Sequence, residues 1–180
     1  EQKARRLVRQ ALAASPRAAA IVTGCYAQVE AAAVSALGAR VLAVGGDAKD
    51  ALLGLPSYLS DNWDGHGDVL DALREWKAGG PAGGGRFAFE PSAFAFHSRP
   101  SLKVQDGCDN RCAYCRVRIA RGRSVSLDPR LALERARSLE ERGAAEIALT
   151  GVNLSQYRWE ELGFPGLLER LVAGTERVAF

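Results

Sequence analysis

The 180-residue sequence contains no methionine, only two histidines and only four cysteines. Because the chain lacks even an initiator methionine and stops within an apolar stretch at 178–180, we expect both of its ends to be cut points in a longer protein. No uninterrupted apolar run is long enough to cross a bilayer, and the first residues lack the pattern of a secretory signal peptide. These absences argue against a membrane partner and against secretion.

The few cysteines are unevenly distributed along the chain. Cys25 stands alone, whereas Cys108, Cys112 and Cys115 fall within eight positions. A disulfide framework usually spreads its cysteines in pairs, so this clustering is instead typical of metal ligation in a reducing compartment. We therefore expect a cytoplasmic protein.

The overall composition is that of a globular chain, with 47% hydrophobic and 25% charged residues. A net charge of +3 and a pI near 8.8 permit a nucleic-acid partner without requiring one. Arginines crowd the segment around and after the clustered cysteines, where they could meet RNA phosphates or form a solvated charged face. These arginines are Arg111, Arg116, Arg118, Arg121, Arg123 and Arg130.

Helical and strand patterns alternate in the first part of the chain. Helices are predicted over 1–14, 28–37, 49–55 and 68–76, and short apolar strands over 18–23 and 40–44. Asp47 is predicted to cap the third helix and Pro56 to help end it. The alternation indicates a small α/β domain with a parallel sheet over residues 1–78.

A glycine-rich connector at 79–85 and phenylalanines that alternate over 87–96, as in a strand, form a predicted linker at 79–98. The domain at 99–180 then begins with a strand over 101–105, followed by the cysteine loop. Asp128 and Pro129 predict the start of a helix that runs to 142, and a strand over 145–150, a helix over 165–173 and a strand from 177 follow. This order is that of the opening of a parallel barrel or open sheet.

The clustered cysteines have the spacing C-x3-C-x2-C in a loop that follows a strand. Thiolates are soft ligands suited to iron–sulfur clusters, and three of them leave one iron of a four-iron cluster open to a substrate. The position after a strand is where barrel active sites lie. Two alternatives are a zinc site, whose nearest fourth ligand would be His97 on the wrong side of the strand, and cysteines that bind no metal.

This spacing, with Tyr114 before the last cysteine, resembles the signature of radical S-adenosylmethionine (SAM) enzymes. Three separate segments resemble the methylthiotransferases of that superfamily, and their local sequence is most similar to that of the branch that acts on N6-threonylcarbamoyladenosine in tRNA. They are residues 22–28 (VTGCYAQ), 102–124 (LKVQDGC to ARGRS) and 147–154 (IALTGVNL). The sequence departs from the family where a proline commonly follows the cysteine loop, and the glycine-rich connector has no counterpart that we recognise.

The resemblance implies two [4Fe-4S] clusters in the intact protein, with SAM as a further cofactor. Cys108, Cys112 and Cys115 would be the catalytic ligands of the first cluster. Cys25 would be one ligand of an auxiliary cluster whose other two cysteines precede residue 1. The residues that the resemblance implies for cofactor binding are Tyr114 near the adenine, Gly151, Asn153 and Arg121.

The implied activity is transfer of a methylthio group to C2 of N6-threonylcarbamoyladenosine at tRNA position 37, by a radical made from SAM. A second SAM would supply the methyl group. The implied partners are the tRNA anticodon stem-loop and an electron donor such as flavodoxin, and the fragment alone is expected to be inactive. The alternatives are the same chemistry on isopentenyladenosine tRNA or on a ribosomal protein and, in another class, a zinc-stabilised RNA-binding module.

Overall fold

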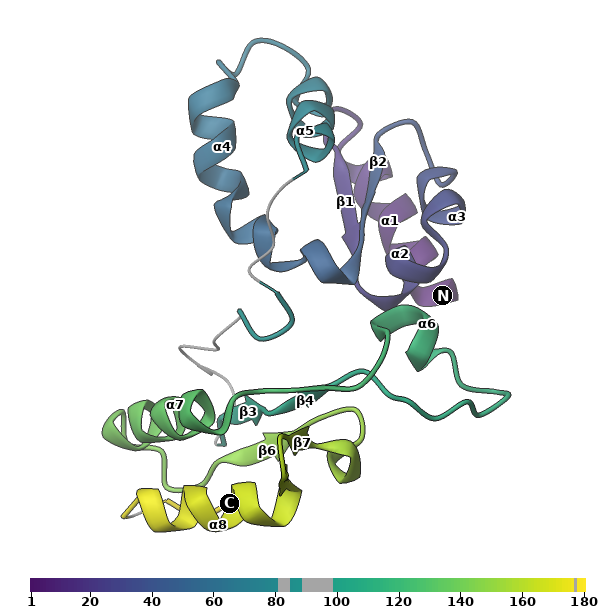
Figure 1. The fold of residues 1–180 in the computed structure, drawn as a ribbon. Coiled ribbons are helices and arrows are strands. Elements are labelled where there is room, and N and C mark those ends of the chain that lie inside the picture. The colour runs from purple at the N-terminus through teal and green to yellow at the C-terminus, as the bar shows by residue number, and fades with distance from the viewer. Residues whose placement is uncertain (81–84, 89–98, 177) are drawn as a thin grey trace. The chain divides into compact units, whose positions relative to one another are not determined.

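The computed structural model describes residues 1–80, 85–88, 99–176 and 178–180 (Figure 1). The chain divides into two compact units, Glu1–Ala88 and Phe89–Phe180, which are described separately below. Most of the predicted linker lies outside the described residues, as do His97 and most of the alternating phenylalanines. Within the described part, no helix has the length and apolar character needed to cross a lipid bilayer.

The first unit is built on two parallel strands with helices on both faces (Figure 1). Its elements are α1 (Gln2–Ala14), β1 (Ala20–Thr23), α2 (Cys25–Val29), α3 (Ala31–Ser35), β2 (Val41–Val44), the 3-10 turns η1 (Gly46–Ala48) and η2 (Asp50–Gly54), α4 (Leu55–Asn62) and α5 (Val69–Ala78). Every residue of β2 is buried, as expected for a strand covered on both sides. Val41 and Ala43 face the helices α1–α3, whereas Leu42 packs against Leu70 and Leu73 of α5.

Two predictions for this unit were wrong. The predicted helix over 28–37 is two short helices, because the backbone leaves helical geometry at Glu30 (φ −128°, ψ 44°). The predicted helix over 49–55 is a pair of 3-10 turns without a cap from Asp47, and Pro56 begins the next helix instead of ending one. Proline lacks a backbone N–H group, and the N–H groups in the first turn of a helix have no hydrogen-bond partner within that helix. Pro56 can therefore occupy the start of a helix as well as the position after its end.

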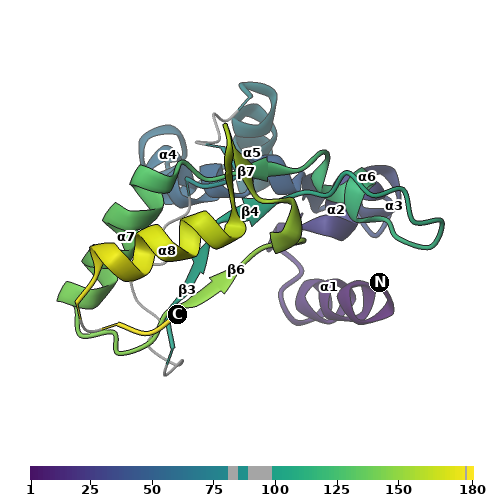
Figure 2. The same ribbon diagram turned by 60° about the horizontal axis from the view of Figure 1, so that its bottom comes forward.

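The second unit contains small parallel and antiparallel strand pairs beside two long helices. Its elements are β3 (Ser101–Lys103), β4 (Gln105–Asp106), α6 (Val117–Arg121), β5 (Val125–Ser126), α7 (Pro129–Glu141), β6 (Ala148–Thr150), η3 (Leu154–Gln156), β7 (Arg158–Trp159), β8 (Leu162–Gly163) and α8 (Phe164–Gly174). Strands β3 and β6 are parallel, and Ala179 forms a further parallel bridge with Glu146 just before β6. Figure 2 shows α7 and α8 side by side next to these strands. Their buried side chains, such as Ala136 and Leu171, form the core of this unit.

The prediction of a mixed α/β chain with parallel strands is confirmed. The Asp128 side chain caps α7 by accepting a hydrogen bond from the Arg130 N–H at 2.8 Å, and the chain leaves the helix through Gly143 at φ +90°. The predicted strand over 101–105 divides at Val104, because β4 pairs with the antiparallel β5 instead of β6. Helix α6 and the β7–β8 hairpin were not predicted.

Candidate functional site

The three clustered cysteines lie in one loop that leaves β4 and returns through α6 to β5. All three are free thiols; Cys108 is partly buried, and Cys112 and Cys115 are exposed. The Cys115 N–H donates to the Cys112 carbonyl at 3.0 Å, which makes a tight turn between them. Within the described residues, no three His, Cys, Asp or Glu side chains converge on a single metal position. The three thiols of the loop therefore do not point to one common metal position in this structure. Their chemistry nevertheless fits an iron–sulfur cluster, because thiolates are the soft ligands that such clusters use.

The two ends of this loop cross at Gly107 and Gly122. Gly107 has φ +73° and Gly122 has φ +70°, both in the range that favours glycine. A methyl group on Gly107 would overlap the carbonyl oxygen of Arg123 and would lie 2.9 Å from that of Gly122. The Cys108 N–H donates to the Gly122 carbonyl at 3.1 Å, so the first cysteine is fixed by a backbone contact across the crossing.

Asp106, the last residue of β4, is a buried carboxylate beneath the loop. It accepts hydrogen bonds from Lys103 Nζ at 2.9 Å, from Arg121 Nη1 at 3.0 Å and from the Gly107 N–H at 2.8 Å. Burial alone would raise the pKa of Asp106, but the hydrogen bonds from Lys103, Arg121 and the Gly107 N–H, together with the charge of Lys103, outweigh it and lower that pKa. Arg121, a predicted cofactor-binding residue, is thus held at this carboxylate.

The loop that follows β6 carries the predicted residues Gly151 and Asn153, and two glutamines tie it to the cysteine loop. The Asn153 N–H donates to the Oε1 atom of the buried Gln105 at 2.8 Å. From η3, Gln156 accepts from the Asp109 N–H at 2.9 Å and donates from Nε2 to Asn110 Oδ1 at 2.9 Å. A side chain on Gly151 would meet Gln105 Oε1 at 2.9 Å, so the two segments are in close contact.

The outer surface of the cysteine loop is basic and carries exposed apolar groups. Arg118 donates to the Asp109 carbonyl at 3.1 Å, and Arg123 donates to the Asp109 carboxylate at 3.3 Å. Tyr114, predicted to lie near an adenine, is 90% exposed, and Ile119 of α6 is 65% exposed. An exposed aromatic ring in a loop that also carries guanidinium groups is suited to contact a flat, anionic ligand such as a nucleotide.

Cys25 lies in the first unit, exposed at the start of α2 directly after Gly24, whose φ is +100°. The neighbouring Thr23 hydroxyl is buried and has no hydrogen-bond partner within the described residues. On the other side, Arg5 donates to the Tyr26 hydroxyl at 2.9 Å and lies 5.8 Å from the ring centre. Cys25 is thus an accessible thiol in a well-fixed turn, with no other cysteine in its unit.

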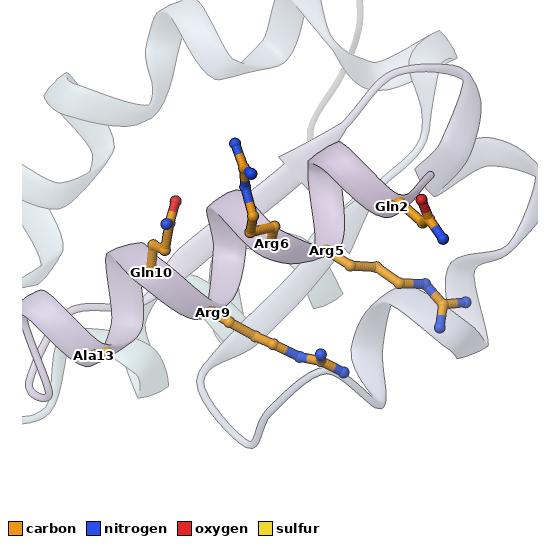
Figure 3. A pocket seen from close by; sticks show the side chains of 6 residues that line it. All are labelled: Gln2, Arg5, Arg6, Arg9, Gln10 and Ala13. Carbon is orange, nitrogen blue, oxygen red and sulfur yellow. The ribbon is translucent and has the colours of Figure 1, made fainter.

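A groove of about 360 Å³ lies in the same unit on one face of α1 (Figure 3). Its lining residues are Gln2, Arg5, Arg6, Arg9, Gln10 and Ala13. Since all of them belong to one helix, the groove is an open space between splayed side chains. None of the predicted site residues lines it.

Sequence reasoning missed Gln105, Asp106 and Gln156. The available signal was the pair of polar residues that directly follows Val104 at the end of the predicted strand, since buried polar groups usually have hydrogen-bond partners. Gln156 gave no such signal, because its partners lie more than 40 positions away in the sequence.

Residues 102–175 match the model of the radical SAM superfamily. The chain is 40% identical to the threonylcarbamoyladenosine tRNA methylthiotransferase MtaB of Treponema pallidum over 99% of this chain and 47% of that protein. It is 30% identical to the protein of the same name from Bacillus subtilis, over 99% of this chain and 39% of that protein. The tRNA-2-methylthio-N(6)-dimethylallyladenosine synthase of Endomicrobium trichonymphae is 36% identical over 44% of this chain and 19% of its own length. The chain thus spans less than half the length of these relatives.

Proposed function

Because this chain belongs to the methylthiotransferase family of the radical SAM superfamily, we propose that it is part of an enzyme that adds a methylthio group to C2 of N6-threonylcarbamoyladenosine in tRNA. One observation carries the choice of substrate. The relatives named for threonylcarbamoyladenosine from Treponema pallidum and Bacillus subtilis match 99% of the chain, whereas the Endomicrobium relative named for dimethylallyladenosine matches 44% of it.

Cys108, Cys112 and Cys115 would hold the catalytic [4Fe-4S] cluster. When bound, that cluster supplies the electron that cleaves SAM and starts radical chemistry. The chain's own contribution is position. The cysteine loop follows β4, which comes directly after β3, and the loop with Gly151 and Asn153 follows β6. Because β3 and β6 pair in parallel, both loops lie at the carboxyl ends of these strands. Gly151 and Asn153 would seat SAM there, and the exposed Tyr114 ring would lie against its adenine.

We assign residues 99–180 to the first β/α units of a radical SAM partial barrel, and the bridge between Glu146 and Ala179 supports a third parallel strand. Residues 1–78 would be the family's amino-terminal domain, and 79–98 a linker. In that domain Cys25 would be one ligand of a second [4Fe-4S] cluster. The exposed Cys25 thiol, which directly follows the left-handed Gly24, is accessible to a ligand at this turn.

The proposed macromolecular partner is the anticodon stem-loop of a tRNA, for which the arginines of the cysteine loop are suited. Arg111 and Arg116 lie in the exposed part of that loop and could meet phosphates directly. Arg121 would act through Asp106, its hydrogen-bond partner, rather than on the RNA. An electron donor such as flavodoxin would complete the system, which we place in the cytoplasm together with its tRNA substrate.

The test uses the intact protein, reconstituted anaerobically with iron and sulfide, together with SAM and a reductant. Two tRNAs are offered, one carrying N6-threonylcarbamoyladenosine and one carrying isopentenyladenosine, and nucleosides are analysed by mass spectrometry. Methylthiolation of the first tRNA, absent in Cys112→Ala, is the expected result. Product on the isopentenyl tRNA alone would overturn the substrate assignment. Zinc bound in place of iron would overturn the assignment of the protein as a radical SAM enzyme.

A further inference from the structure

Gln105 is one of two buried polar or charged residues among those the structure describes, and it is completely inaccessible to solvent. A buried amide without partners would destabilise the fold by about 1–3 kcal/mol. All of its hydrogen-bonding groups are instead engaged. Nε2 donates toward the Gly107 carbonyl at 2.8 Å, the Ser124 hydroxyl at 2.9 Å and the Asp106 carbonyl at 3.1 Å, while Oε1 accepts from the Asn153 N–H at 2.8 Å.

These partners belong to three separate segments of the second unit. Gly107 directly precedes the first clustered cysteine, Ser124 follows the return of the cysteine loop, and Asn153 lies in the loop after β6. Ser124 and Asn153 are 19 and 48 positions away from Gln105 in the sequence. A single side chain therefore spans both ends of the cysteine loop and the loop beyond β6.

The contact with the loop after β6 is tight as well as polar. A side chain at Gly151 would meet Gln105 at Cβ and Oε1, at 3.0 and 2.9 Å, and Leu154 Cδ2 at 2.8 Å. The glycine thus lets the loop lie directly on the glutamine. Because the Asn153 N–H has its partner in Oε1, displacement of the amide would leave this N–H unpaired and weaken the attachment of the loop to the strand below it.

We propose that Gln105 is a positioning residue that sets the loop 151–154 at a fixed distance from the cysteine loop, so that SAM held by one is presented to the cluster held by the other. This inference rests on the proposed function and names the residue that joins its two halves. Only an amide has the required chemistry: the site needs a donor toward two carbonyls and an acceptor toward an N–H. A carboxylate would place its negative charge against the carbonyl oxygens, and a thioether has no donor and only a weakly accepting sulfur.

The test is Gln105→Met in the intact protein, a change that keeps most of the volume and removes the hydrogen bonds. Ile147→Val is the matched control, because Ile147 is equally buried in the same unit and no hydrogen bond of its side chain is possible. Three properties are measured: iron bound per chain, the dissociation constant of SAM, and the electron paramagnetic resonance spectrum of the reduced cluster with and without SAM.

With Gln105→Met we expect an iron content near that of the unaltered protein and a SAM affinity about tenfold weaker. The change that SAM causes in the electron paramagnetic resonance spectrum should then require about tenfold more SAM. Ile147→Val should change none of these. Hydrogen exchange at the Asn153 amide, measured without cofactors, should be faster in Gln105→Met and unchanged in the control. Unaltered SAM affinity together with unaltered exchange would overturn the proposal while leaving the proposed function intact. Unaltered protein that binds iron but no SAM would overturn both.

Discussion

Replacement of Gly107 by alanine gives the sharpest test of how the cysteine loop is built. Gly107 has φ +73°, and a methyl group there would overlap the carbonyl oxygen of Arg123. Gly143, which follows α7 in the same unit, has φ +90°, but a methyl group there would meet no atom within 4 Å. The two substitutions therefore share the backbone strain of a left-handed residue and differ in the steric overlap.

The expected magnitudes follow from these contacts. Left-handed geometry costs a residue with a side chain about 1–2 kcal/mol, and this is the whole effect expected for Gly143→Ala. At Gly107 the crossing strand must also move, which adds about 1–3 kcal/mol of overpacking. Loss of the hydrogen bond from Cys108 to the Gly122 carbonyl adds about 0.5–1.5 kcal/mol. Gly107→Ala should therefore destabilise the unit by about 3–6 kcal/mol, a large part of the stability of a small domain.

The assay is urea unfolding followed by circular dichroism, combined with iron analysis after anaerobic reconstitution. Gly143→Ala should unfold at slightly lower urea and bind as much iron as the unaltered protein, whereas Gly107→Ala should lose both stability and iron. Equal stability of the two variants would refute the steric argument. A Gly107→Ala protein that is destabilised but binds iron normally would show that the crossing does not position Cys108.

Three further outcomes can be checked by simpler measurements. Cys112→Ala should abolish binding of iron and sulfide to the radical SAM site while leaving the circular dichroism spectrum unchanged; full iron content in this variant would exclude the cysteine as a ligand. Burial raises the pKa of Tyr157 to about 12 from 10.0, so its neutral form stabilises the fold below about pH 10 and that contribution is lost as pH rises through 12. Urea unfolding at alkaline pH should show this loss, and Tyr157→Phe should remove it, at the cost of the hydrogen bond to the Leu127 carbonyl. In the first unit the Arg40 guanidinium lowers the pKa of Asp68 below its ordinary 3.8, so the pair stabilises the fold above about pH 4 and less as pH falls; Arg40→Met should reduce the acid sensitivity of unfolding, and equal sensitivity would contradict the assignment.

The sequence predicts best those elements whose ends are marked by local chemistry. The start of α7 follows from Asp128 and Pro129, and its end from Gly143, because capping and left-handed geometry depend on a few adjacent residues. Pro56 shows the limit of such signals, since proline fits the first turn of a helix as well as the position beyond its end. The β7–β8 hairpin was missed because each strand is only two residues long.

The candidate site divides in the same way. The cysteine spacing and the segment that contains Gly151 and Asn153 were visible as local motifs, and their assignment to a cluster and to SAM stays a prediction. Gln105 could not be identified as a link between them, because its partners at Ser124 and Asn153 come from distant segments that only folding brings together. The pairing of Arg121 with Asp106 was hidden for the same reason.

The crossing of Gly107 and Gly122 also bears on how this part of the chain tolerates variation. Both ends of the segment 108–122 are fastened at one place, by the bond from Cys108 to Gly122 and by the β4–β5 pairing just outside it. Changes within the segment alter a closed loop whose anchor points stay fixed, and loop-closure entropy grows only slowly with length. Substitutions at exposed positions of this segment can therefore alter the surface of the loop without shifting the strands beneath it, provided that they spare its contacts with Asp106 and Gln156.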